Sequence, residues 1–129
     1  MELSASAYEK VVDNDPHVWV VKFYSRMCGS CKAFKPDFEA ARGKVDGLHW
    51  AQVSIDDKEN IGLAKKLGVL TEGIPNVKII NAAEMPLPVV SGATPSADEV
   101  VAKLRETLQS AGATTDAEGF YQARGRAEL

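Results

Sequence analysis

The chain has 129 residues and a mass of 13.9 kDa, which is the size of one compact domain and too short for a two-domain enzyme. Hydrophobic residues make up 45% and charged residues 26% of the sequence, so the composition is that of an ordinary globular protein. The net charge of -3 predicts no nucleic-acid partner, and no apolar run approaches the length of about 20 residues that a membrane span needs. We therefore expect a monomer that binds neither nucleic acid nor membrane.

Helix and strand patterns alternate along the chain. Residues 18–24, Val-Trp-Val-Val-Lys-Phe-Tyr, are β-branched and aromatic with almost no alternation, which is typical of a strand covered on both faces. The helix that follows contains Pro36, which predicts a kink because proline cannot donate a backbone hydrogen bond. In chain order we expect a helix at 4–12, a strand at 18–24, a helix at 31–44, a strand at 48–55, a helix at 59–67, strands at 76–80 and 87–90, and a closing helix after Ser96.

Local signals define the end of the domain. Pro86 and Pro88 confine the strand at 87–90 to a sheet edge, since proline cannot donate to a ladder. Ser96 and Glu99 have the spacing of a capping box before the closing helix. We expect one domain over residues 1–110, followed by a C-terminal tail over residues 111–129.

The segment Cys28-Gly29-Ser30-Cys31 carries the chemistry of the chain. Thiol-disulfide exchange needs one thiol that ionises near neutral pH and a second that can close a ring and release the mixed disulfide. If the preceding strand ends at Tyr24 and a helix starts near Gly29, Cys28 lies at a helix N-terminus, where free amide donors favour a thiolate. Cys28 is therefore the expected nucleophile and Cys31 the resolving thiol.

Two other uses of these cysteines have little support in the sequence. A zinc site would need two further ligands, and the two histidines, His17 and His49, lack the paired spacing of a zinc module. Lys32 after Cys31 does not fit a haem-attachment pattern. We expect neither a metal nor a cofactor.

The chain resembles the thioredoxin superfamily over about residues 4–110. The segment from Phe23 to Lys32 is similar to the Phe-Tyr-Ala-Pro-Trp-Cys-Gly-His-Cys-Lys segment of protein disulfide isomerase catalytic domains. The resemblance implies an α/β fold with three layers, in which a central mixed β-sheet is flanked by helices. It also implies that Pro75 is a cis-proline facing the dithiol, and that Met27, Ile74 and Pro75 contact an extended substrate peptide.

The dipeptide between the cysteines departs from the family pattern. Disulfide isomerases usually have Gly-His there and thioredoxins Gly-Pro, whereas this chain has Gly29-Ser30. Ser30 removes an imidazolium that would stabilise the thiolate, although its hydroxyl can donate one hydrogen bond. On this ground we expect a site that is less oxidising than an isomerase's.

Two basic residues are candidates for tuning the thiols. Lys22 stands where the family carries a buried Asp or Glu that accepts the proton of the resolving thiol. A buried lysine can lose its proton and act as a base, or it can stay charged and stabilise thiolates, or its amine can reach the surface. Arg26, two residues before Cys28, is the nearby arginine that could supply a positive charge.

The function that this sequence favours is a disulfide isomerase-like oxidoreductase. Its partners would be unfolded or disulfide-bearing proteins, together with glutathione or a thiol oxidase or reductase. Two alternatives stay open, namely a thioredoxin-type reductant of the cytosol or an organelle, and a non-catalytic, chaperone-like binding module. A reduction potential would separate the two enzymes, and turnover would exclude the module.

The termini suggest a location in the endoplasmic reticulum lumen. The first residues show no secretory signal, so we expect that such a signal is absent or has been removed. The last four residues, from Arg126 to Leu129, weakly resemble the Lys-Asp-Glu-Leu retrieval signal. The alternative location is the cytoplasm or another organelle.

Overall fold

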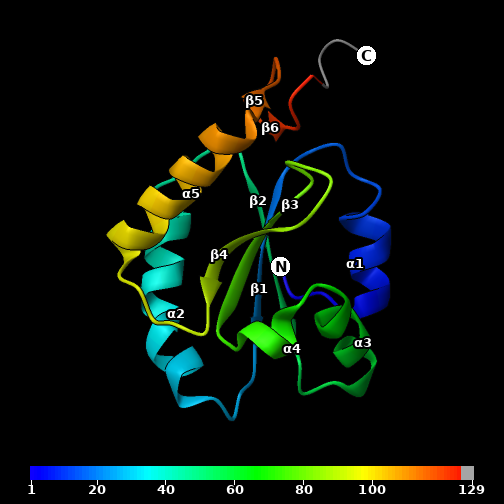
Figure 1. The fold of residues 1–129 in the computed structure, drawn as a ribbon, viewed down its shortest axis with the longest axis vertical. Coiled ribbons are helices and arrows are strands. Elements are labelled where there is room, and N and C mark those ends of the chain that lie inside the picture. The colour runs from blue at the N-terminus through cyan, green and yellow to red at the C-terminus, as the bar shows by residue number, and fades with distance from the viewer. Residues whose placement is uncertain (126–129) are drawn as a thin grey trace.

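A four-stranded mixed sheet forms the centre of the computed structural model, which describes residues 1–125 (Figure 1). The strand order is β2-β1-β3-β4, with β1 parallel to β2 and antiparallel to β3, and β4 antiparallel to β3 at the edge. The strands are β1 (Trp19–Tyr24), β2 (His49–Ser54), β3 (Asn76–Ile80) and β4 (Leu87–Ser91), and the helices are α1 (Ala5–Val11), α2 (Gly29–Arg42), α3 (Lys58–Lys66), α4 (Val69–Glu72) and α5 (Ala97–Ala111). The expected three-layer α/β fold is confirmed.

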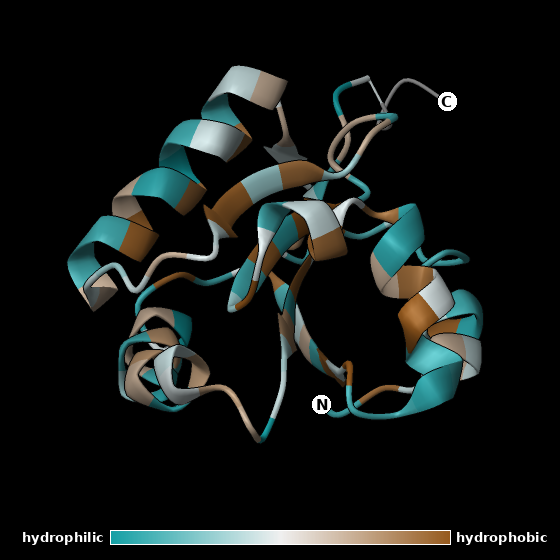
Figure 2. Cartoon of the chain, turned by 60° about the horizontal axis from the view of Figure 1, so that its bottom comes forward, coloured by the Kyte–Doolittle hydropathy of each residue, from teal (hydrophilic) through white to brown (hydrophobic). Residues whose placement is uncertain are grey.

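Strand β1 is buried on both faces, as its composition predicts. Val18 and Val20 pack in one hydrophobic cluster with side chains of α2 and α5, whereas Val21 and Phe23 pack in a second cluster with α1 and α3. Figure 2 shows hydrophobic residues along the central strands, between the helices. The alternating residues of β1 therefore join the two halves of the core.

Several predicted helix ends agree with the structure. Ser4 caps α1 by accepting a hydrogen bond from Ala7, and the capping box of Ser96 and Glu99 is complete at α5. Pro36 lies inside α2. No helix within residues 1–125 is long and apolar enough to cross a membrane.

Two short elements were not expected from the sequence. Helix α4 is a single turn in the segment read as a loop, and its Val69 is fully buried in the second cluster. In the segment assigned to a tail, β5 (Thr114–Thr115) and β6 (Tyr121–Gln122) form a hairpin. The retrieval-like tetrapeptide at 126–129 lies outside the described residues.

Backbone hydrogen bonds fasten this hairpin to the start of the sheet. The Tyr121 carbonyl accepts from Val18 N–H at 2.9 Å, and Tyr121 N–H donates to the Gly47 carbonyl at 2.8 Å. Gly47 has a φ of 82°, and a Cβ there would lie 2.5 Å from the Gly119 carbonyl oxygen. Only glycine permits this close approach of the hairpin to the residue that precedes β2 by two positions.

An ion pair between a buried ammonium and a partly exposed carboxylate joins α4 to strand β3. The Lys78 ammonium, on a side chain that is 3% exposed, donates to Glu72 Oε1 at 2.6 Å. Asn76 and Ser91 donate to the same oxygen, at 3.1 and 3.4 Å. The Glu72 carboxylate is thus engaged within the fold.

The two partners of this pair should differ in their effect on stability. Glu72→Ala leaves the Lys78 ammonium buried without its counter-charge, which should lower the free energy of unfolding by about 3 kcal/mol. Lys78→Met removes the buried charge and should change it by no more than about 1 kcal/mol. The measurement is urea unfolding, with Glu106→Ala on the exposed face of α5 as a control. Equal losses for both variants would contradict this account.

The hydrogen bond from Lys78 is the main cause that lowers the pKa of Glu72. A carboxylate whose pKa is lower in the folded state contributes stability above its unfolded pKa, about 4.3, and this contribution is lost as the pH falls through the folded value. The difference in stability between the wild type and Glu72→Ala should therefore shrink on acidification.

Candidate active site

Cys28 is the N-cap residue of α2. Its sulfur accepts a hydrogen bond from the Cys31 backbone N–H at 3.1 Å and lies 3.4 Å from Ser30 Oγ. Burial alone would raise the pKa of Cys28, but hydrogen bonds from Cys31 and Ser30 outweigh it and hold the pKa below its usual value. The side chain is partly exposed, so the thiolate is both favoured and accessible.

Cys31 has the opposite environment, one turn into the helix. It is buried, with 6% of its surface exposed. Burial, together with the hydrogen bond to Cys28, raises the pKa of Cys31 to about 11. Both cysteines are free thiols in this structure. The environments therefore separate the ionisation of two adjacent thiols in the direction expected from the sequence.

Lys22 is buried in the middle of β1, with 4% of its surface exposed. Its Nζ lies 4.6 Å from the centre of the Phe38 ring and 5.4 Å from that of Tyr24. Burial lowers the pKa of this amine, and Glu39 and Cys31 act against that effect. In turn, Lys22 lowers the pKa of Cys31, although less than burial raises it. The amine therefore does not reach the surface as a snorkelling lysine would.

A cavity of about 250 Å³ opens beside the resolving thiol. Cys31, Lys22, Arg26, Lys32 and Lys35 are among the residues that line it. The structure thus brings Lys22 and Arg26 to the same cavity as the buried thiol. The exposed side chains of Arg26, Lys32 and Lys35 make this cavity attractive to an anionic group.

The turn between β1 and the dithiol is held by Asp56, a residue that follows β2 and belongs to no motif in the sequence. The Asp56 carboxylate accepts from Ser25 Oγ at 2.6 Å and from Arg26 N–H at 2.9 Å. These hydrogen bonds lower the pKa of Asp56. The sequence carried a usable signal, because residues that follow two parallel neighbouring strands meet at the same sheet edge.

The Ile74–Pro75 peptide bond is cis, as the family resemblance implies. The Pro75 carbonyl accepts from Gly92 N–H at 2.9 Å, which ties the loop to the end of β4. No hydrogen bond among residues 1–125 uses the backbone N–H or C=O of Ile74. These two groups are therefore free to pair with another extended chain.

Met27 lies directly before the nucleophile and is 88% exposed. A large apolar side chain at this exposure leaves thioether and methylene surface open to a partner. Gly29 begins α2, and a Cβ built there would meet no atom within 4 Å. Neither Met27 nor Gly29 closes the approach to the Cys28 sulfur.

A thioredoxin-like fold with a helix-capping dithiol defines the class of thiol-disulfide oxidoreductases. The Thioredoxin family model matches residues 1–106, and the chain belongs to this family.

Curated relatives agree with this class. The chain is 32% identical over 99 residues to human protein disulfide-isomerase A6, covering 74% of this chain and 22% of that protein. It is 31% identical over 118 residues to protein disulfide-isomerase of Gallus gallus, covering 89% of this chain and 22% of that protein. The chain thus spans about a fifth of the length of these relatives.

Two solved domains show the same fold. The Trx4 domain of ERdj5 superposes with a TM-score of 0.68 at 21% identity, covering 85% of this chain and 96% of that one. The first thioredoxin domain of mouse protein disulfide-isomerase A4 superposes with a TM-score of 0.62 at 25% identity, covering 84% of this chain and 74% of that one.

Ser30→Ala tests the origin of the thiolate. Loss of the hydroxyl should raise the pKa of Cys28, because the hydrogen bond from Ser30 is one of the contacts that lower it. The measurement is the pH dependence of iodoacetamide alkylation, with Ser110→Ala on exposed α5 as a control. Faster alkylation of Cys31 than of Cys28 in the native protein would overturn the assignment of roles.

Proposed function

We propose that this protein is a disulfide isomerase-like oxidoreductase that exchanges disulfides with protein substrates through Cys28-Gly29-Ser30-Cys31. The observation that carries the proposal is the contrast between the two thiols. Cys28 is accessible and its pKa is lowered, whereas Cys31 is buried with a pKa of about 11. An attacking thiolate and a protonated resolving thiol are the two components that the exchange reaction needs.

The reaction proceeds in two displacements. The Cys28 thiolate attacks one sulfur of a substrate disulfide, and the other substrate sulfur leaves as a thiolate and takes up a proton. Cys31 then loses its proton and attacks Cys28 Sγ, which releases the second substrate thiolate and forms the Cys28–Cys31 disulfide. Two electrons pass to the substrate, and the reverse sequence oxidises a substrate dithiol.

Lys22 is the group that we assign to the proton of Cys31. A thiol with a pKa of about 11 is a poor nucleophile at neutral pH unless a base takes its proton. Burial lowers the pKa of Lys22, and its amine lines the cavity that Cys31 also lines. A neutral amine at this place can accept the proton and become an ammonium beside the new thiolate.

The substrate would lie across the loop before β3. The contacts that we propose for it are the free backbone groups of Ile74, next to Pro75, and the exposed side chain of Met27, next to Cys28. Pairing of an extended peptide with backbone groups reads shape more than sequence, which suits unfolded proteins with varied disulfides. The basic cavity beside Cys31 could receive a carboxylate of glutathione, the redox partner that we propose alongside a thiol oxidase or reductase.

The relatives support a role in the endoplasmic reticulum lumen, where disulfides form and persist. A cytosolic or organellar thioredoxin-type reductant is the second candidate, and Ser30 in place of an isomerase histidine favours it. A reduction potential measured in glutathione buffers separates the two, because about 30 mV corresponds to a tenfold change in equilibrium constant.

Turnover of substrate is the direct test. The intact chain should reduce insulin with dithiothreitol and should reactivate scrambled ribonuclease in glutathione buffer. Cys28→Ser should abolish both activities, whereas Cys31→Ser should accumulate mixed disulfides because its release step is missing. An intact chain that suppresses aggregation but shows neither activity would instead be a binding module.

Lys22→Met should slow the release of the mixed disulfide by about 100-fold or more, the range expected when a positioned base is lost. Lys22→Glu, which supplies the carboxylate usual in the family, should restore much of the rate. The measurement is single-turnover kinetics with a fluorescent disulfide peptide, and Lys35→Met at the same cavity is the control. If Lys22 acts only as a charge, Lys22→Met should instead raise the pKa of Cys28 and leave release unchanged.

A further inference from the structure

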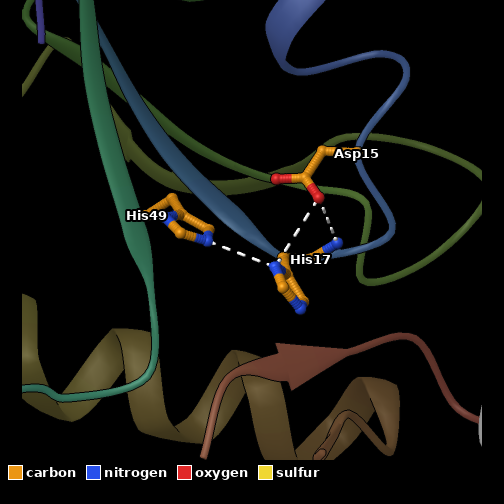
Figure 3. A group of neighbouring side chains, drawn as sticks. All are labelled: Asp15, His17 and His49. Carbon is orange, nitrogen blue, oxygen red and sulfur yellow. Dashed lines mark hydrogen bonds and ion pairs between the residues drawn. The ribbon is translucent and has the colours of Figure 1, made fainter. Parts of the chain in front are cut away.

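The two histidines of the chain meet at the end of the sheet opposite the dithiol. His17 precedes β1 and His49 begins β2. Because these strands are parallel, the two residues lie at the same end of the sheet. His17 Nδ1 is 3.2 Å from His49 Nε2 and 3.6 Å from Asp15 Oδ1, and Figure 3 shows the three side chains converging. Their spacing in the sequence had argued against pairing, and this argument is overturned by the parallel register.

Two of the three distances between the donor atoms fit a tetrahedral cation. Two ligands bound at 2.0–2.1 Å on a tetrahedral zinc ion lie about 3.3–3.4 Å apart. His17 Nδ1 lies 3.2 Å from His49 Nε2 and 3.6 Å from Asp15 Oδ1, and both distances are close to this ligand–ligand distance. All three donor atoms lie within 4.8 Å of one another.

The hydrogen bond between His17 Nε2 and Asp116 leaves the lone pair of His17 Nδ1 available to a cation. His17 Nε2 lies 2.9 Å from Asp116 Oδ2, on the loop of the C-terminal hairpin. A carboxylate only accepts hydrogen bonds, so the neutral ring carries its proton on Nε2 and turns the lone pair of Nδ1 toward His49. A carboxylate behind a histidine is the arrangement that orients metal-bound imidazoles in proteins.

The other two donors are also held in place. Asp15 Oδ2 accepts from the indole of Trp19 at 2.8 Å, and its Oδ1 accepts from the backbone N–H of His17 at 3.2 Å. The His49 ring stacks on Phe120, with ring centres 4.7 Å apart and planes 8° from parallel, and on Trp19 at 4.9 Å. The side chains of Asp15 and His17 keep 21% and 24% of their surface exposed, so solvent reaches the donors.

We propose that Asp15, His17 and His49 form a binding site for a divalent cation of zinc type, with the fourth position left to water. Two imidazole nitrogens and one carboxylate oxygen suit zinc better than magnesium or calcium, which prefer oxygen ligands. Binding requires the proton on His49 to move from Nε2, where it is shared with His17, to Nδ1. Through Asp116 and Phe120 the cation would hold the C-terminal hairpin against the start of β1 and β2.

Zinc alone is the probe, and the dithiol must first be removed because thiolates also bind zinc. In the variant Cys28→Ser, Cys31→Ser, calorimetric titration with zinc chloride should show one ion per chain and a rise in the thermal unfolding midpoint. His17→Ala and His49→Ala, each added to this background, should abolish the binding. Because this background has no redox activity, the result is independent of the proposed function.

A second pair of variants tests whether the Asp116 carboxylate acts through its hydrogen bond to His17 or only through its negative charge. Asp116→Asn should weaken zinc binding by about 10–100-fold, whereas Glu118→Gln, in the same hairpin loop, should leave it unchanged. In the nitrogen NMR spectrum of the imidazole rings, zinc should shift the resonances of His17 Nδ1 and of both His49 nitrogens, because the His49 proton passes to Nδ1, and should leave His17 Nε2 protonated. This measurement does not depend on a variant that folds.

Three results would overturn the proposal. The first is an absence of saturable zinc binding in the background without the dithiol, which would show that the cluster is a hydrogen-bond network only. The second is binding that survives in His49→Ala. The third is a nitrogen NMR spectrum in which zinc leaves the resonances of His17 Nδ1 and His49 Nε2 unchanged.

Discussion

The burial of β1 on both faces is the constraint on which the rest of the structure depends. One set of its side chains packs with α2 and α5, and the alternate set packs with α1 and α3. A strand fixed in this way cannot slide by one residue without exchanging its two buried faces. Its two ends are therefore fixed points, with the dithiol following one end and His17 preceding the other.

At the carboxyl end, the chemistry follows from the backbone groups that a helix leaves free. The first turn of α2 has amide donors without partners in the helix, and Cys28 is placed where its sulfur accepts one of them. The same turn buries Cys31, so one helix end lowers the pKa of the first thiol while burial raises that of the second. The difference between the pKa values of the two thiols therefore arises without an imidazolium, and the Ser30 hydroxyl adds one further donor to Cys28.

The sequence predicted what depends on local pattern and on short motifs. The sequence alone predicts three such features, because each is contained in a few consecutive residues: the strand at 18–24, the capping box at Ser96 and the dithiol at a strand-to-helix junction. Helix α4 and the C-terminal hairpin could not be predicted, because a single helical turn and two strands of two residues are too short to show a periodic pattern. The hairpin is set by pairing with Gly47 and Val18, far away in the chain.

Contacts between parallel strands account for the functional residues that were missed. Asp56 follows β2 and meets the turn that follows β1, and His49 begins β2 beside the residue that precedes β1. Neither pair is close in sequence, so spacing rules could not find them. Once a parallel register of these two strands is accepted, both pairs follow from one geometric fact.

Lys22 links the charge of the site to its redox state. The negative form of Cys31 raises the pKa of Lys22, and reciprocally the ammonium of Lys22 lowers the pKa of Cys31. Cys31 is protonated at neutral pH because its pKa is about 11, so its thiolate exists only after Lys22 has taken the proton. When the disulfide forms, this thiolate disappears while the burial that lowers the pKa of the amine remains, so disulfide formation favours the return of Lys22 to its neutral form. The pKa of a buried carboxylate in this position would also change with redox state. It would fall once the thiolates are gone, so the carboxylate would gain a negative charge on oxidation, whereas Lys22 loses a positive one.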